Sequence, residues 1–503
     1  MDSTQLHGRR MITTDYEEIT DANIVEVMRE SLTTHWKNRR EIEFLYNYYK
    51  GRQPIIDRVK EVRPEICNKV VENIANEIVT FKSGYLMGEP IQYVSRGDAS
   101  DNTDSINTLN EYVFAEEKAA KDKTLADWFH ICGTAFRMIL PDSAVHQEED
   151  ESPFEIYTLD PRNTFIVYEN ALGNKPLLAV KYVVDKHNVV HYTCYSEDRY
   201  WEIENWTVTE TGINPIGMIP IVEYPLNMAR VGAFELVLPL LDAINTTDSN
   251  RLDGLEQFVQ ALMLFHNVDI SSDDYEKLRE EGAIKFRDID GTMKGEIQYL
   301  TATLNQSETQ TLEDHLYQIV LEITGMPNRN GGSSTSDTGS AVIMRDGWSS
   351  AEARAKDTEL MFKQSERESL KLILLICKKL RNMKLKVSDV EIRFTRRNYE
   401  NIYQKAQVLD LMLKNTKVHP RLAFEHSGMF ADPDLAYALS EEYAEEQQKK
   451  LQEQQEAIGN ESGNDTEGSG TDSGDSETRE QSGSSDRTRK DHSGGNQTKA
   501  PLS

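Results

Sequence analysis

The 503-residue chain is poor in cysteine and has no long hydrophobic run. Its four cysteines are scattered and form no paired motif, which favours free buried thiols in a reducing compartment. No stretch approaches the roughly 18 apolar residues of a membrane-spanning helix. Arg9 and Arg10 lie near the start without a following apolar segment, so we expect no signal peptide. These absences predict a protein without a membrane partner.

Catalytic motifs are also missing. A phosphate-binding loop needs Gly-x-x-x-x-Gly-Lys-Ser/Thr, and neither Gly-Lys-Ser nor Gly-Lys-Thr occurs. There is no Gly-x-Ser-x-Gly nucleophile elbow. His130 and Cys132 lie in an apolar helical pattern typical of a core, and His187 and His191 lack a further ligand at metal-site spacing. The sequence therefore predicts no catalytic residue, no metal and no cofactor.

The charge balance is strongly acidic, with 85 Asp and Glu against 56 Lys and Arg and a formal net charge of -29. Non-specific DNA affinity comes from Lys and Arg that replace counterions on phosphates, so tight DNA binding is disfavoured. DNA passing nearby is not disfavoured, because a surface that repels phosphate lets it slide.

The first 230 residues mix helices with strands. Apolar residues at helical spacing predict helices over 23–50, 66–84 and 107–136. A short strand at 390–395 could complete the following sheet from a distance. Runs separated by Gly, Asn, Asp and Pro predict an antiparallel sheet of strands 136–140, 154–159, 164–168, 177–184, 189–195 and 200–206.

Residues 233–324 predict two long helices joined by a small β tip. The first helix spans 233–262 and the second 306–324, which begins with a Ser307/Gln310 capping box. Strands are expected at 283–289 and 296–302, with a turn between them. The first helix has an apolar face for packing and a polar face for water or a passing ligand. That polar stripe consists of Asp242, Asn245, Ser249, Asp253, Glu256 and Gln260.

A Gly/Ser-rich loop from Asn328 to Gly339 follows and has no apolar side chain to bury. It is either a flexible surface loop or a mobile loop held at a functional constriction. A helix over 340–383 comes next, and Gly347, Ser349 and Ser350 predict a kink near its start. Helices are then expected at 399–415, 421–429 and 434–455, before a disordered tail of Gly, Ser, Asp, Glu and Thr.

Three short motifs stand in a characteristic order before this helix–β–helix–loop–helix block. They are Tyr46-Asn47-Tyr48-Tyr49-Lys50-Gly51, Gly84-Tyr85-Leu86-Met87-Gly88-Glu89-Pro90-Ile91 and Ile219-Pro220-Ile221-Val222. With them, residues 20–445 resemble the portal proteins of tailed bacteriophages, of the siphovirus type from Gram-positive hosts. The resemblance implies an α+β portal fold that assembles as a ring, usually of about twelve subunits, around a central channel.

The resemblance also implies an order of domains. These are a mixed α/β wing (1–230, completed by 385–398), stem helices (231–262 and 305–326), a β-containing clip (263–304), a tunnel loop (327–339), a long kinked spine helix (340–384), a helical crown (399–455) and a disordered tail (456–503).

By the same resemblance, the ring would occupy one vertex of the virion capsid, after assembly in the host cytoplasm. Double-stranded DNA would pass through it during packaging and ejection. The implied partners are the terminase large subunit, a head-completion or adaptor protein, and the major capsid and scaffolding proteins. The channel residues would be Asn328, Arg329, Asn330, Gly331, Gly332, Ser333, Ser334, Thr335 and Ser336 of the loop with Asp242, Asp253 and Glu256 of the stem, and the partner-binding residues Lys285, Arg287, Asp288, Asp290 and Lys294 of the clip.

Two other classes stay open from sequence. One is a non-catalytic intracellular scaffold or adaptor built on long helices, although the apolar face of the 340–383 helix is irregular for a sustained coiled coil. The other is a DNA-processing enzyme of the packaging machinery, for which neither a phosphate-binding motif nor an acidic metal cluster stands out.

Overall fold

The computed structural model describes residues 6–96, 102–142, 152–259, 262–266, 268–269, 287–288, 296–300, 306–328, 347–395, 402–430 and 433–461. The chain forms two units, Met1–Asp434 and Leu435–Ser503. The described part of the second unit is the helix α12 (Pro433–Glu461) from Leu435 onward. Helices and strands are mixed throughout the first unit, so the predicted α+β class is confirmed.

Two sheets replace the single antiparallel sheet predicted from sequence. The larger follows the order β1-β5-β6-β7-β8-β9, and β1 is parallel to β5 while the other pairs are antiparallel. The smaller follows the order β10-β3-β4. The strands are β1 (Ile12–Thr14), β3 (Thr134–Pro141), β4 (Phe154–Leu159), β5 (Thr164–Glu169), β6 (Pro176–Val184), β7 (Val190–Tyr195), β8 (Arg199–Glu204), β9 (Thr207–Ile213) and β10 (Ile221–Pro225).

The N-terminal helices agree with the sequence prediction only in part. Helix α1 (Ile24–Tyr49) matches, but α2 (Ile74–Leu86) begins eight residues later than predicted. The predicted 107–136 helix is instead α3 (Thr103–Ala115) and α4 (Lys118–Cys132), which are separated at Glu117 by a left-handed backbone with φ of 50°. Residues from Thr134 onward already belong to β3 because they pair with β4 and β10.

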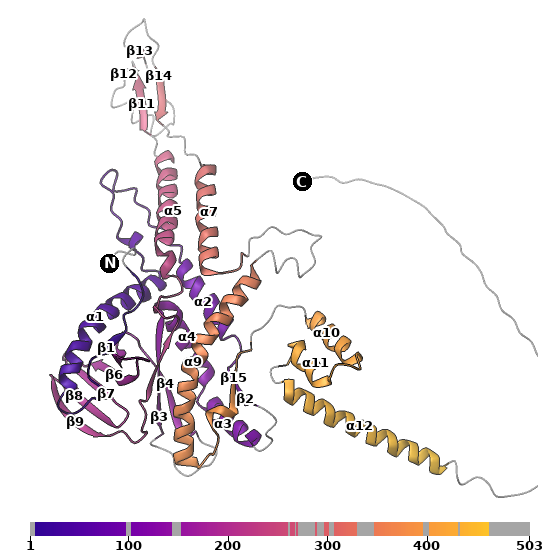
Figure 1. Ribbon diagram of the computed structural model, residues 1–503. Coiled ribbons are helices and arrows are strands. Elements are labelled where there is room, and N and C mark those ends of the chain that lie inside the picture. The colour runs from indigo at the N-terminus through magenta and orange to yellow at the C-terminus, as the bar shows by residue number, and fades with distance from the viewer. Residues whose placement is uncertain are drawn as a thin grey trace, which may run out of the picture. The chain divides into compact units, whose positions relative to one another are not determined.

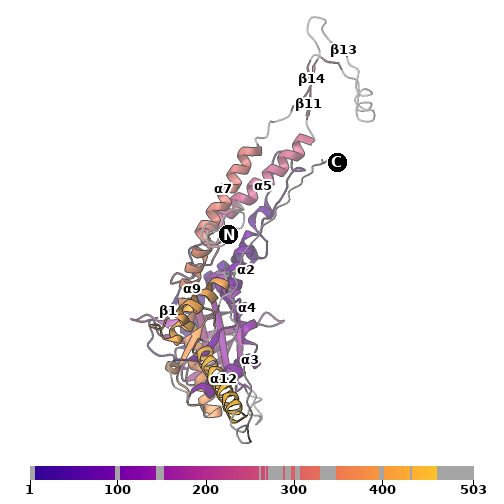
Figure 2. The same cartoon turned by 90° about the vertical axis from the view of Figure 1, so that its right-hand side faces the viewer.

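The two long helices pack side by side as predicted (Figures 1 and 2). They are α5 (Leu238–Val259) and α7 (Gln306–Thr324), and we call them the helix pair. The strands beyond them differ from the prediction. Strand β11 (Leu262–His266) starts inside the predicted helix and pairs with β14 (Glu296–Leu300), while β12 (Val268–Asp269) pairs with β13 (Arg287–Asp288). β13 and β14 lie within the predicted strands 283–289 and 296–302, but each pairs with another strand, so the predicted pairing of the two as a hairpin is wrong.

The long C-terminal helix is α9 (Trp348–Arg381), which lies against β3 and β10 (Figure 1). Gly347 has φ of 81° and forms its N-cap, so the helix begins where a kink was predicted. Strand β15 (Val390–Arg393) pairs with β2 (Gln92–Ser95) in a separate two-stranded sheet and completes neither large sheet. Helices α10 (Ile402–Lys414) and α11 (Pro420–Ser427) match the prediction.

Four hydrophobic clusters of described residues connect these elements, and the fourth of them joins β3 and β10 to β5 and β6. Ile24, Val27 and Met28 of α1 pack on the six-stranded sheet. A second cluster joins the other end of α1 to α2 and the base of the helix pair, and a third joins α9 to α3, α4 and the three-stranded sheet. No helix of the described residues is both long and apolar enough to cross a membrane.

Four buried charged side chains lie inside the third cluster. Arg137 of β3 contacts Asp122 of α4 and pairs with Glu366 of α9 at 2.9 Å. Lys118 of α4 pairs with the same two carboxylates at 2.7 and 2.8 Å. Burial alone would raise the pKa of Glu366, but Lys118 and Arg137 outweigh it and lower this pKa to about 2. The group therefore joins three elements as a charge-balanced set, which we call the buried ion cluster.

We expect Arg137→Met to destabilise the protein by about 3–5 kcal/mol, because it leaves buried carboxylates without a partner. The control is Arg199→Met, which removes an exposed pair with Asp21 and should cost under about 1 kcal/mol. Urea unfolding at neutral pH compares the two, and equal losses would contradict the prediction. Since the pKa of Glu366 is lowered from 4.5, the cluster's contribution is present above that pH and is lost as the pH falls toward 2.

Candidate functional site

Three residues in the middle of the polar stripe of α5 contact the chain itself rather than water. Asn245 and Ser249 are fully buried and Asp253 is 3% exposed. They accept hydrogen bonds from backbone N–H groups of an extended segment: Glu72 N–H to Asn245 Oδ1 at 2.8 Å, Val70 N–H to Ser249 Oγ at 3.0 Å and Asn68 N–H to Asp253 Oδ1 at 2.7 Å. We call residues 67–73 the strap. The expectation that the stripe forms one solvent-facing side of the helix is wrong at these three positions.

The strap can bind α5 at three points because its N–H donors and the acceptors on the helix have nearly the same spacing. The three acceptors are four residues apart on a helix, which separates them by about 6 Å at 1.5 Å per residue. The three donors are two residues apart on an extended chain, which separates them by about 6.6 Å. Each alternate N–H of the strap therefore meets one side chain of α5, with the two chains running in opposite directions. Because these bonds satisfy its backbone, the strap stays extended even though Val70 and Val71 fit a helical pattern.

Asp253 is the most strongly held member of the stripe. Its carboxylate pairs with Arg58 at 3.1 Å and with Lys60 at 3.0 Å, and it accepts the bond from Asn68. Burial raises its pKa, but the bonds from Asn68 and Lys60 outweigh burial, so the net effect is a lowered pKa. Asp253 thus stabilises the strap and does not face solvent, as a channel-lining residue would.

The other two channel candidates differ from Asp253. Asp242 is half-buried and accepts a hydrogen bond from the Tyr48 hydroxyl at 2.9 Å. Burial first, and then the Asp242 carboxylate, raise the pKa of that phenol. Glu256 is exposed. Among the described stem candidates, Glu256 is therefore the carboxylate that a passing polyanion could approach most freely.

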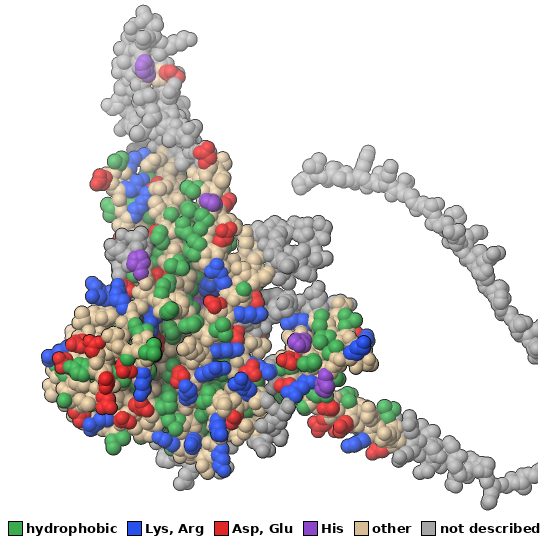
Figure 3. All heavy atoms as spheres, in the orientation of Figure 1, with side chains coloured by type: hydrophobic (Ala, Val, Ile, Leu, Met, Phe, Trp, Pro, Cys, Tyr) green, Lys and Arg blue, Asp and Glu red, His purple; other side chains and the backbone are tan. Residues whose placement is uncertain are grey.

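Some exposed positions of the helix pair carry apolar side chains among the polar ones. Leu252 and Leu255 on α5 are 43% and 49% exposed, and Leu312 on α7 is 50% exposed. Figure 3 shows hydrophobic side chains at the surface along the helix pair. Exposed apolar side chains of this kind are what a protein–protein contact could cover.

A second charged group lies where the strap meets both long helices. Carboxylate oxygens of Glu72, Asp248 and Glu313 lie within 4.8 Å of one another. Burial is the first cause that raises the pKa of each of the three. Arg251 contacts Glu313 and lies 3.8 Å from Asp248, so an internal cation already partly compensates the group. The cluster connects the strap, α5 and α7 without requiring an ion.

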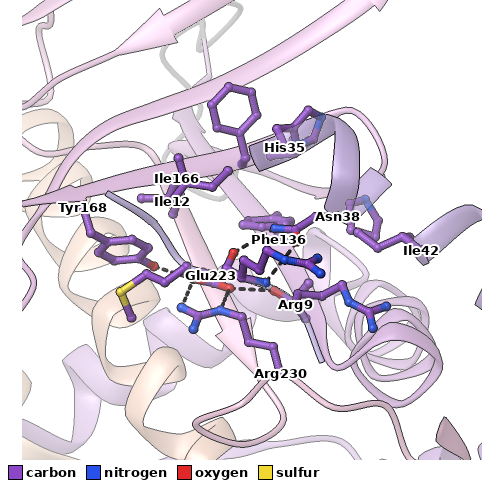
Figure 4. A pocket seen from close by; sticks show the side chains of 16 residues that line it. Arg9, Ile12, His35, Asn38, Ile42, Phe136, Ile166, Tyr168, Glu223 and Arg230 are labelled. Carbon is purple, nitrogen blue, oxygen red and sulfur yellow. Dashed lines mark hydrogen bonds and ion pairs between the residues drawn. The ribbon is translucent and has the colours of Figure 1, made fainter. Parts of the chain in front are cut away.

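A pocket between the N-terminal segment, α1 and the sheets contains groups that the sequence did not single out (Figure 4). Glu223 accepts bonds from Tyr168, Thr134 and Arg230, and the last pair is 2.6 Å apart. Burial raises the pKa of Glu223, but Arg230 and the hydroxyls outweigh it and lower the pKa. Arg9 lines the same pocket and pairs with Glu235 at 2.6 Å. Because these charges compensate one another, the pocket acts as a structural joint.

The predicted loop and clip residues lie largely outside the described part of the chain. Asn328 is described, and its Nδ2 donates to Gln318 Oε1 at 3.2 Å. Arg287 and Asp288 form β13. The residues that fall outside the description are Arg329, Asn330, Gly331, Gly332, Ser333, Ser334, Thr335, Ser336, Lys285, Asp290 and Lys294.

Comparison with known proteins gives the chain a family. The family model "Phage portal protein, SPP1 Gp6-like" matches residues 29–461. The chain belongs to this phage portal protein family. The match confirms the resemblance drawn from the three sequence motifs, and it places the portal protein among bacteriophage capsid proteins of DNA packaging.

Other comparisons add little to the family match. No curated protein matches the portal protein. A solved structure, "Neck of empty GTA particle computed with C6 symmetry", is similar with a TM-score of 0.46 and 11% identity. That similarity covers 71% of this chain and 90% of the other.

We expect Asp253→Ala to release the strap and Glu256→Ala to leave it in place. The first removes the acceptor of Arg58, Lys60 and Asn68, whereas Glu256 is an exposed acid of the same helix. Limited trypsin digestion with mass spectrometry should show cleavage at Arg58, Lys60 and Lys69 accelerated at least about tenfold in Asp253→Ala, as follows from a local opening made about 1.4 kcal/mol easier. Equal cleavage in the two variants would contradict the role of Asp253.

Proposed function

We propose that this portal protein forms a ring of about twelve copies at one capsid vertex and serves as a channel for double-stranded DNA during packaging and ejection. The observation that carries the proposal is the family match over residues 29–461. Portal proteins of this family are generally not enzymes, and we propose that the energy for DNA movement comes from a separate ATPase.

The helix pair supports an oligomer. Three members of its polar stripe bind the strap, while Leu252, Leu255 and Leu312 remain exposed. A second copy that covers these side chains would bury apolar area at about 25 cal/mol per Å². A surface that meets a different surface on the next copy closes into a ring when the rotation allows.

The charge of the chain supports a low-friction channel. Twelve copies would carry roughly -348 formal charges, twelve times -29. Glu256 and Asp242 are the channel-lining stem residues that we propose. Asp253 is excluded from this role because the strap covers it.

The remaining parts follow the domain order of the family. We propose that the described strand pairs β11/β14 and β12/β13 form the clip, where free strand edges can pair with the terminase large subunit and later with a head-completion protein. Residues 329–336 would approach the DNA as a tunnel loop. Capsid and scaffolding proteins would contact the ring within the head.

Purified protein should form particles of about 690 kDa, twelve times the 57.5 kDa chain. Mass photometry over a range of salt and protein concentration measures this directly. Particles of another ring size would revise the subunit number, whereas monomers under every condition would overturn the proposal.

Deletion of Asn330–Ser336 should leave rings intact but reduce DNA packaging, because the loop is proposed to contact DNA and not neighbouring subunits. A packaging assay that counts nuclease-protected genomes checks this, with ring mass as the control. Unchanged packaging by loop-deleted rings would remove the loop from the mechanism.

A further inference from the structure

A pocket at the base of the helix pair lacks the acidic groups that are abundant elsewhere in the chain. It lies between α2, α4 and α9, next to the turn that ends α7 (Figure 1 shows these helices). Among the described residues that line it there is no Asp or Glu, although the chain has 85 of them. The lining includes Lys82, Arg354 and His130, together with apolar and hydroxyl side chains.

Neither cation of the pocket has a carboxylate partner among the described residues. Lys82 makes no hydrogen bond or ion pair with them. Arg354 donates to the carbonyl oxygens of Ile323 and Glu322, at 2.8 and 3.3 Å, which are backbone groups at the end of α7. Lys82 is half-buried and Arg354 is exposed, so water still reaches both, but the pocket keeps two positive charges that a carboxylate could pair.

The surroundings do not neutralise the two charges. His130 is fully buried, and burial first and then Lys82 lower its pKa to about 3, so the imidazole is neutral. Glu352 on α9 is engaged elsewhere, since it accepts a bond from the Tyr85 hydroxyl at 2.7 Å and lies 3.6 Å from Lys356. Burial, followed by the charge of Arg354, lowers the pKa of Lys82 to about 8.

The position of Arg354 is fixed by the backbone beneath it. Gly325 has φ of 70°, and a Cβ at this position would lie 2.1 Å from Arg354 Cδ. The arginine therefore crosses directly over the glycine and reaches the carbonyls of α7. Arg354 is thus held at the pocket from α9, and Lys82 reaches the pocket from α2. An anion in the pocket would be attracted by both charges.

We propose that this pocket receives a carboxylate side chain from a second copy of the chain. Among the described residues the pocket has no carboxylate, and the acidic surplus of 85 against 56 means that a neighbouring copy presents many. The surroundings favour a protein over nucleic acid, because Ile323, whose carbonyl oxygen binds Arg354, is 39% exposed. The contact rests on the proposed ring. It would make Lys82 and Arg354 part of an interface between neighbouring subunits.

A zero-length carbodiimide tests the contact, because it joins an amine to a carboxylate only when the two touch. Rings are assembled from equal amounts of ¹⁴N and ¹⁵N chains, treated, digested and analysed by mass spectrometry. We expect Lys82 linked to an Asp or Glu peptide, with about half of the linked pairs carrying one label of each kind. Linked pairs of a single label only would place the acid in the same chain and overturn the proposal.

Matched variants test the energetic role. Lys82→Gln should raise the protein concentration needed for half-assembly at least about tenfold, since removal of one member of a desolvated pair weakens an interface by more than about 1.4 kcal/mol. Lys82→Arg should assemble nearly as the wild type does. Lys384→Gln makes the same charge change at an exposed lysine after α9 and should have no effect. Circular dichroism checks that each variant folds.

The outcomes separate this contact from the ring itself. Rings that form normally with Lys82→Gln, and in which Lys82 stays reactive toward an amine reagent, would overturn the contact and leave the proposed function intact. Chains that never assemble would overturn both. Protection of Lys82 that appears only with added inorganic phosphate or with DNA would show a different anion in the pocket and would also overturn the proposal.

Discussion

The hydrogen bonds between the strap and α5 determine the character of the helix pair. Asn245, Ser249 and Asp253 lie on one side of the helix and would suit solvent, yet all three bind backbone N–H groups of the same chain. These three are therefore covered, while Glu256 of the same stripe stays exposed and Leu252 and Leu255 are exposed beside it. Which polar side chains of α5 other molecules can reach thus follows from how the neighbouring segment satisfies its backbone.

The buried ion cluster has a comparable role deeper in the molecule. Arg137 and Lys118 hold the carboxylates of Asp122 and Glu366 at the meeting point of α4, β3 and α9. Such clusters contribute less net stability than apolar packing would, but a wrong arrangement leaves a buried charge unpaired. The cluster accordingly fixes the position of α9 against the sheet, and with it the start of the helix beside Lys82 and Arg354.

Local periodicity predicted most of the elements, and the family could be identified from motif order. Helix α1 and strands β3 to β8 follow from their own residues. Two of the failures share one cause, which is pairing with distant parts of the chain. The strap fits a helical pattern, but α5 satisfies its N–H groups, and the predicted first helix runs to Leu262, which pairs with Leu300 as the first residue of β11. The sequence shows the three acceptors at four-residue intervals on α5. It does not show that alternate N–H groups of the strap face them. Asp253 was misjudged for the same reason, because its partners Arg58 and Lys60 are almost 200 residues away.

The strap also limits how α5 can move. Its three bonds align only when alternate residues of an extended chain face every fourth residue of the helix, so an axial slip of one helical residue, about 1.5 Å, misaligns all three together. The strap therefore resists axial sliding of α5, and the contact of Arg251 with Glu313 of α7 restrains the same part of the helix from the side. A displacement of α5 along its axis would therefore be transmitted to α2 through the strap, because the three hydrogen bonds prevent the two segments from sliding past each other.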